Sequence, residues 1–195
     1  MSDKIFGLVL AGGSSRRMKK DKALLDYHGQ PQLLWAYELL AQHCEETFVS
    51  VRKDQHDKVR DALPRIDDLD DDLGPAGGLL AAAARSPEST WLAVACDLPF
   101  LNDKIIKHLI AKRDKSCIAT AYRSTTDRLP EPLCAIWEPA GLAYLQDQVD
   151  RGLLCPRKAL ILGSSRILDP VSASALENIN TPEEHDDAIG VLGDR

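Results

Sequence analysis

Short apolar runs recur along the chain, and the segments between them carry apolar residues at helical spacing. Each run is too short for a typical helix and is nearly continuous, a pattern typical of strands buried on both faces of a sheet. The pattern predicts strands over residues 5–10, 47–51, 91–96, 117–122 and 133–137. The intervening segments predict helices over residues 32–44, 54–63, 76–85, 103–113 and 140–149.

Strand and helix alternate in this pattern, which predicts a mainly parallel sheet with helices on both faces, the three-layer α/β class. The 195 residues suffice for one sizeable core, so we predict a single domain over residues 1–195. Near the end, the TPEE sequence has the pattern of a capping box and predicts a helix over residues 182–189. Residues 123–132 and 152–166 are less regular and are expected to be loops that contribute to substrate binding.

Composition narrows the classes of partner. The formal net charge of −6 argues against nonspecific nucleic-acid binding, which depends on broad positive potential. No apolar run approaches the roughly 20 residues of a membrane helix, and the first residues do not resemble a signal peptide, so we expect a cytoplasmic protein with no membrane partner. The five cysteines show no metal-binding spacing and are expected to be buried small hydrophobes. A small anionic ligand in a local basic site is compatible with this composition.

The first predicted strand runs into LVLAGGSSRRMKKDK at residues 8–22, where two glycines precede a dense basic cluster. In an open parallel sheet, ligands bind beyond the carboxyl ends of the strands, and this loop leaves the first strand at such an end. Gly12 and Gly13 let backbone N–H groups converge on phosphate oxygens. The spacing fits neither the P-loop nor the dinucleotide fingerprint. We therefore predict a phosphate-binding loop of another kind; the alternative is a solvated loop with a basic face.

A second candidate residue follows the predicted strand over residues 91–96. Asp97 would emerge at the same edge of the sheet as the glycine loop. Polyphosphates carry Mg²⁺, a hard cation that usually takes one or two carboxylates together with phosphate oxygens and water. We therefore predict that Asp97 binds Mg²⁺ as the cofactor; the alternative is a turn or helix-capping residue.

An acidic segment precedes a second glycine-rich segment. Five of the six residues 67–72 are Asp, and the sequence GPAGG follows at residues 74–78. Most of these carboxylates are expected to be solvated, but one can accept the adjacent N–H donors of a guanine edge. The glycines allow a close backbone approach at a helix start and offer further amides to a nucleotide.

These segments in this order, LAGGSSRRMKKDKALL, GPAGGLLAA, ACDLPFL and NINTPEE, resemble the MobA-like nucleotidyltransferases of molybdenum cofactor biosynthesis, most closely the guanylyltransferases among them. The anchors of the resemblance extend over residues 8–184. It implies a single Rossmann-like α/β domain that transfers GMP from GTP to the phosphate of molybdopterin, the acceptor. It further implies release of pyrophosphate and a requirement for Mg²⁺. It also leaves room for protein partners that receive the finished cofactor.

The resemblance assigns the phosphate side of the site. Lys22 is the implied contact to the triphosphate, and Asp97 matches the metal-binding Asp. The residues implied to line the nucleotide phosphates and ribose are Leu10, Ala11, Gly12 and Gly13. Negative charge builds on the leaving pyrophosphate, so Lys22, Mg²⁺ and either Arg16 or Arg17 would stabilise the transition state. The attacking phosphate is already ionised, so no histidine is expected to act as a base.

The resemblance also touches the base side of the nucleotide and the end of the chain. Asp67 matches the guanine-side carboxylate, with Asp68 or Asp71 as alternatives. Asn180 matches a family Asn near the site, and Asn178 would lie on the same face if this segment is a strand. These assignments are what the resemblance implies about the site.

The chain departs from the family pattern at three places. Lys19 stands where the family usually has Gly, and Ser50 where it often has Asn. Glu131 stands where relatives commonly have His before Pro, so a difference is expected on the molybdopterin side. Further along the chain, Arg157 and Lys158 either hold the phosphate of the acceptor or are ordinary solvent-facing residues.

Functions of two other kinds stay open. A cytidylyltransferase or a sugar-phosphate nucleotidyltransferase would share the fold. The Gly12-Gly13 and Asp21-Lys22 pairs favour guanylyl transfer by resemblance. The other alternative is not an enzyme: a catalytically silent nucleotide-binding module that regulates a partner protein or delivers the cofactor to it.

Overall fold

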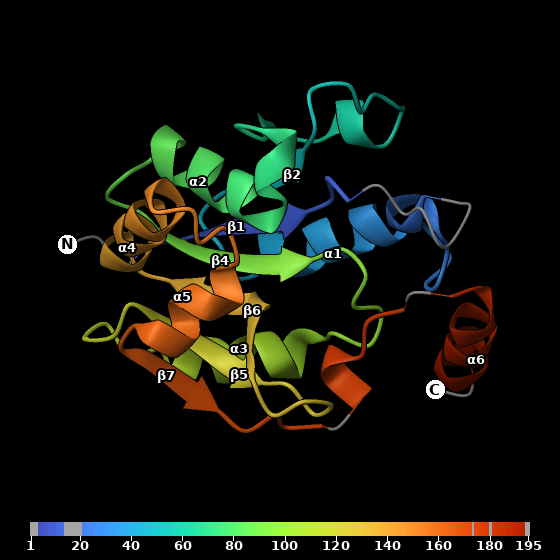
Figure 1. Cartoon of the computed structure of the whole chain (residues 1–195). Coiled ribbons are helices and arrows are strands. Elements are labelled where there is room, and N and C mark those ends of the chain that lie inside the picture. Colours follow the sequence, from blue (N-terminus) through green and yellow to red (C-terminus); the bar gives the residue numbers. More distant parts are fainter. Residues whose placement is uncertain (1–3, 14–20, 173, 180, 194–195) are drawn as a thin grey trace.

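Figure 1 shows the computed structural model of the chain, which describes residues 4–13, 21–172, 174–179 and 181–193. The strands are β1 (Ile5–Leu10), β2 (Thr47–Val51), β3 (Arg65–Asp67), β4 (Thr90–Ala95), β5 (Ala119–Arg123), β6 (Pro130–Trp137) and β7 (Ser165–Leu168). They form one seven-stranded sheet in the order β3-β2-β1-β4-β6-β5-β7. Neighbouring strands are parallel except at β6, which runs antiparallel to both β4 and β5.

Helices cover both faces of this sheet. They are α1 (Gln32–Ala41), α2 (Pro75–Arg85), α3 (Asp103–Ala111), α4 (Pro139–Asp150) and α5 (Pro156–Leu162). A further helix, α6 (Pro182–Gly193), lies to the side of the sheet. Side chains of α1 and α3 share one apolar cluster with the sheet, and those of α2, α4 and α5 share another. Figure 1 shows where these helices lie around the sheet. The predicted three-layer α/β fold with a mainly parallel sheet is confirmed. Among the described residues, no helix is both long and apolar enough to cross a membrane.

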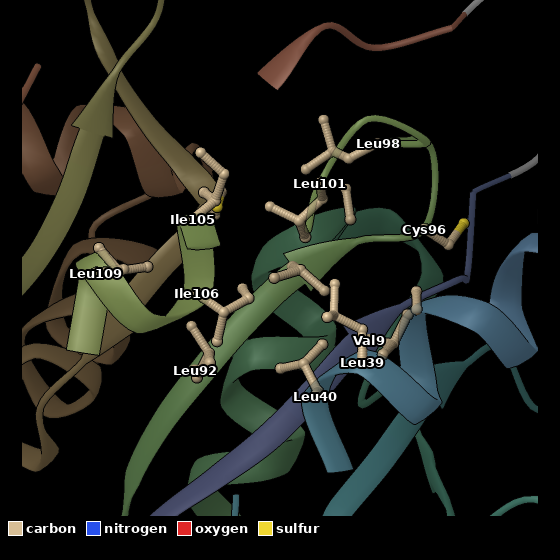
Figure 2. Close-up of a cluster of buried hydrophobic side chains, with 14 of the residues drawn as sticks. Val9, Leu39, Leu40, Leu92, Cys96, Leu98, Leu101, Ile105, Ile106 and Leu109 are labelled. Carbon is tan, nitrogen blue, oxygen red and sulfur yellow. The ribbon is translucent and has the colours of Figure 1, made fainter. Parts of the chain in front are cut away.

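The two cores follow from the alternation of side chains along the central strands. Leu8 and Val9 are neighbours on β1, yet Leu8 belongs to the cluster under α2 and Val9 to the cluster under α1. Figure 2 shows Val9 and Leu92 of the sheet with Leu40 of α1 and Ile106 of α3. None of these side chains is exposed to solvent. Burial on both faces makes the sheet a rigid support for the loops at its edges.

The five predicted strands are confirmed, with end shifts of at most three residues. β3 and β7 lie outside the predictions. Each is an edge strand, and charged residues interrupt its sequence, RID in one case and SRIL in the other. An edge strand has only one neighbour and keeps more of its surface in water, so it needs no continuous apolar run.

Two predictions about the connecting segments are wrong. The segment predicted as a helix over residues 54–63 contains only a 3₁₀ turn, η2 (Arg60–Ala62). Its Asp57 side chain accepts the backbone N–H groups of Val59 and Arg60, an arrangement that competes with helical hydrogen bonding. Conversely, α5 lies within residues 152–166, which were expected to form a loop. Pro156 occupies the first position of this short helix, where a missing N–H is tolerated.

The predicted C-terminal helix is confirmed, and α6 begins with the expected capping box. The Thr181 N–H donates to Glu184 Oε2 at 3.1 Å, and the Glu184 N–H donates to Thr181 Oγ1 at 3.2 Å. Further along α6, Ala188 packs with Phe100 and Ile179 in a small apolar cluster. Because Phe100 follows the end of β4, this cluster holds α6 near the carboxyl edge of the sheet.

Candidate functional site

Two loops leave neighbouring strands at one edge of the sheet. β1 and β4 pair in parallel, and Leu10 at the end of β1 lies opposite Ala95 at the end of β4. The Cys96 N–H continues this pairing by donating to the Leu10 carbonyl at 3.1 Å. The loop that contains Gly12 and the segment that begins with Asp97 therefore leave the sheet side by side.

Lys22 and Asp97 meet at this edge. The Asp21 side chain caps the 3₁₀ turn η1 (Lys22–Leu24) by accepting a backbone N–H of the turn at 3.0 Å. Lys22 Nζ lies 3.0 Å from Asp97 Oδ2, and 16% and 19% of the two side chains are exposed. Asn178 Nδ2 lies 3.5 Å from Asp97 Oδ1. Residues distant in sequence thus converge on one carboxylate that is largely shielded from water.

A buried arginine joins the turn that carries Lys22 to the glycine loop. Arg60 is 1% exposed, and its Nη2 lies 2.8 Å from Asp21 Oδ2 and 3.5 Å from the Ala11 carbonyl oxygen. Its Nη1 forms an ion pair with Asp57. Burial alone would lower the pKa of Arg60, but Asp57 and Asp21 outweigh that effect and raise it. The charged guanidinium therefore fixes Asp21, and with it the turn at Lys22.

Within the acidic segment, Asp68 rather than Asp67 lies against the glycine loop. Asp67 is exposed, and its Oδ1 lies 2.6 Å from Arg65 Nη2 on the same strand. Asp68 is 8% exposed and accepts a hydrogen bond from the Ser50 hydroxyl. A Cβ added to Gly12 would lie only 2.5 Å from Asp68 Oδ2. The alternative carboxylate, Asp68, is thus the one that contacts the loop, while the role assigned to Asp67 stays a prediction.

The glycines at the start of α2 allow a similarly close approach. A Cβ added to Gly78 would overlap the Ser50 hydroxyl and the Leu10 side chain. A Cβ added to Gly77 would lie 2.9 Å from the Asp70 carbonyl oxygen. The start of α2 therefore packs directly on the ends of β1 and β2. The contact of its amides with a nucleotide stays a prediction.

Gly12→Ala is expected to lower the free energy of unfolding by about 1–3 kcal/mol, because the new Cβ would push Asp68 away from Ser50. Gly13→Ala is the matched control. Among the described residues, a Cβ at Gly13 meets nothing within 4 Å, so the expected change is below about 0.5 kcal/mol. Urea denaturation without nucleotide measures both values. Equal stability of the two variants would contradict the close approach of Gly12 to Asp68.

The MobA-like NTP transferase domain family matches residues 7–161. The chain belongs to this family. A curated relative from Synechocystis sp., named molybdenum cofactor biosynthesis bifunctional protein, is 38% identical over 182 residues, 93% of this chain and 52% of that protein. A molybdenum cofactor guanylyltransferase from Xanthomonas euvesicatoria is 37% identical over 115 residues, 58% of this chain and 57% of that protein. The chain thus spans about half the length of these two curated relatives.

A solved structure shares the fold of this MobA-like domain. It is molybdopterin-guanine dinucleotide biosynthesis protein A from Archaeoglobus fulgidus, with a TM-score of 0.78 and 21% sequence identity. The likeness covers 97% of this chain and all of that chain. At this level of identity, the comparison shows a common fold.

A second polar cluster of the MobA-like domain lies on the other side of β4. The pairing of β4 and β6 ends at Val94 and Cys134, so Asp97 and Glu131 lie beyond it toward the same end of the two strands. Arg157 of α5 lies 3.1 Å from Glu131 Oε2 through Nη2 and 2.8 Å from Asp127 Oδ2 through Nη1. Burial raises the pKa of Glu131; Arg157 opposes this shift, and the negative charge of Asp97 adds to it. Glu131 is therefore close enough to Asp97 for their charges to interact.

Some predicted residues cannot be placed, and some neighbours of the site were not predicted. Arg16 and Asn180 lie outside the described residues, so their roles stay predictions.

Two arginines beside the site were not predicted. Arg52 Nη1 donates to the Gly12 carbonyl at 2.7 Å, and Arg60 supports the same loop. Arg52 directly follows a predicted strand, a signal that places it at the correct edge. Arg60 carries no such signal, because it lies in a segment with a helical pattern.

Proposed function

We propose that this chain transfers GMP from GTP to the phosphate of molybdopterin and releases pyrophosphate. The observation that carries the proposal is the meeting of Lys22 and Asp97 beside the Gly12 loop, in a chain of the MobA-like family. A curated relative bears the name of this activity. A cation and a carboxylate beside a glycine loop at the end of parallel strands suit a triphosphate and its metal. We further propose that the 195 residues act as one nucleotidyltransferase unit.

The nucleotide would bind over the ends of β1, β2 and β3. The glycine loop would offer N–H groups to the phosphates, as the resemblance implies. We favour Asp68 over Asp67 for the contact with the guanine N–H donors, since Asp68 lies against Gly12 while Asp67 pairs with Arg65. The hydrogen bond from Ser50 would hold the Asp68 carboxylate in place for that contact.

The donors at Asp97 fit Mg²⁺. This cation usually takes one or two carboxylates and completes its coordination with phosphate oxygens and water, so a single Asp suffices when a triphosphate is bound. Lys22 and Asn178 both contact Asp97 and would orient its carboxylate. When bound, the cation would neutralise charge on the phosphates.

The reaction would be an in-line displacement at the α-phosphorus of GTP. A phosphate oxygen of the acceptor forms the new bond to phosphorus, and the bond to the β-phosphate oxygen breaks, with its electron pair leaving on pyrophosphate. Lys22 would stabilise the charge on the leaving group. Arg157 and the exposed Lys158 follow β6 in the chain, and Arg157 contacts Glu131 near the start of β6, so we assign the phosphate of the acceptor to that side. The attacking phosphate is ionised at neutral pH, so no general base is needed.

Pyrophosphate release tests this proposal. The protein with GTP, Mg²⁺ and molybdopterin is expected to release pyrophosphate and to form a guanine dinucleotide that mass spectrometry detects. A ligand that binds the native state raises the unfolding temperature, so GTP is expected to raise it more than CTP does. A larger shift with CTP would overturn the choice of guanine. Binding of GTP without pyrophosphate release in the presence of molybdopterin would support a silent nucleotide-binding module instead.

A further inference from the structure

We propose that Glu131 is a positioning residue that holds the Arg157 guanidinium in the orientation in which it binds the phosphate of the acceptor. The inference rests on the proposed function, because it assigns the acceptor side of the same site. Glu131 stands at the start of β6, and Arg157 stands in the first turn of α5. Their ion pair, at 3.1 Å, joins these two elements.

The strand order separates the two sides of the site. β1 and β6 flank β4 on opposite sides, so the Gly12 loop lies on one side of Asp97 and Glu131 on the other. The Ser50 and Asp68 side chains belong to the β1 side, because β2 and β3 follow β1 in the sheet. In-line displacement requires the entering and leaving groups to lie on opposite sides of the α-phosphorus. If the pyrophosphate leaves on the β1 side, where the Gly12 loop lies, the phosphate of the acceptor approaches from the β6 side.

The guanidinium of Arg157 is held at two points. Nη1 lies 2.8 Å from Asp127 Oδ2, and Nη2 lies 3.1 Å from Glu131 Oε2. A guanidinium has five N–H donors in a rigid planar fork, so two carboxylate contacts leave further donors for phosphate oxygens. Arg157 also keeps 31% of its side chain exposed, so an incoming phosphate can reach it. The carboxylates therefore fix the plane of the fork without occupying all of it.

Burial identifies Glu131 as the partner that sets this orientation. Its side chain is 12% exposed, whereas that of Asp127 is 41% exposed. Water screens the pair with Asp127, and exposed ion pairs constrain their partners weakly. The pair with Glu131 lies in a less polarisable environment, where a charge-assisted hydrogen bond is stronger. Glu131 also lies in β6, where it pairs with Tyr122 of β5, while Asp127 lies in the connection between β5 and β6.

Steady-state kinetics of Glu131→Gln test the inference. We expect the KM for molybdopterin to rise about 10- to 100-fold, because a misoriented Arg157 binds the phosphate poorly. The KM for GTP is expected to change by less than about twofold, since the nucleotide binds on the other side of Asp97. Asp127→Asn is the matched control, which removes the exposed partner of the same arginine and is expected to raise the KM for molybdopterin less than about threefold.

Two further variants separate positioning from a structural role. In an Arg157→Ala background, Glu131→Gln is expected to raise the KM for molybdopterin no further, because its effect passes through the missing guanidinium. Glu131→Asp keeps the charge and is expected to recover part of the loss, which also covers the case in which Glu131→Gln does not fold. An equal effect with and without Arg157, or an equal rise in both KM values, would overturn the inference. An inactive wild type would contradict the proposed function itself, whereas an active wild type with an unaffected Glu131→Gln variant contradicts the inference alone.

Discussion

Asp97→Ala is expected to lower the rate of GMP transfer by about 100-fold or more while the protein stays folded. The substitution removes the proposed metal ligand and the carboxylate that lies 3.0 Å from Lys22 Nζ. Both losses would leave the charge on the leaving pyrophosphate less well stabilised. The backbone should keep its place, because Ile179 N–H donates to the Asp97 carbonyl and does not depend on the side chain. Pyrophosphate release with GTP and molybdopterin measures the rate, and circular dichroism checks the fold.

Two controls make this result specific. Asp97→Asn preserves the size of the side chain but not its charge, so a similar loss in Asp97→Asn and Asp97→Ala would trace the effect to charge. Asp147→Ala removes an exposed carboxylate from α4, which pairs only with Arg151 among the described ion pairs, and is expected to leave the rate unchanged. Near-normal turnover in both Asp97 variants would remove Asp97 from the proposed metal site.

The sequence alone places the Gly12 loop near Asp97 because the rule behind that prediction is geometric. Both segments follow short apolar runs, and parallel neighbouring strands end at the same edge of a sheet. The choice between Asp67 and Asp68 cannot be made from that rule. Adjacent residues of an extended segment point to opposite sides, so an error of one residue in the predicted register would turn Asp67 instead of Asp68 toward the Gly12 loop. β3 has only three residues, with charges at both ends, so it offers no apolar pattern to set that register.

Partners that are distant in sequence explain the rest of what could not be predicted. Arg60 is buried because it pairs with Asp21 as well as with its near neighbour Asp57, and no local pattern encodes the distant partner. By helical spacing alone, its segment looks amphipathic. The same limit applies to Arg157. The sequence leaves open whether it binds the phosphate of the acceptor or only faces solvent, and its partners Glu131 and Asp127 are seen only in the structure. Local periodicity thus predicts the layers of the fold, whereas ion pairs between residues distant in sequence can be identified only in the three-dimensional structure.

Glu138→Ala is expected to lower the free energy of unfolding by about 3–5 kcal/mol, a large share of the stability of a typical domain. Arg113 makes two contacts with Glu138, at 2.6 Å through Nε and at 2.7 Å through Nη2, and both side chains are less than a tenth exposed. The Thr90 hydroxyl completes the cluster by donating to Glu138 Oε2 at 3.0 Å. Removal of the carboxylate would leave the buried Arg113 charge without its partner. Urea denaturation measures the loss.

Replacing the pair by apolar residues, Arg113→Met together with Glu138→Leu, is expected to restore most of the stability lost in Glu138→Ala, because no buried charge is then left uncompensated. Arg151→Met, which breaks an exposed pair on α4, is expected to change the free energy by less than about 0.5 kcal/mol. Thr90 begins β4 and Glu138 follows β6, so this cluster lies at the ends of β4 and β6 that are farthest from Asp97 and Glu131. Glu138→Ala should therefore keep its rate of GMP transfer per folded molecule at low temperature. A lower rate in fully folded Glu138→Ala protein would show that the two ends of these strands are coupled.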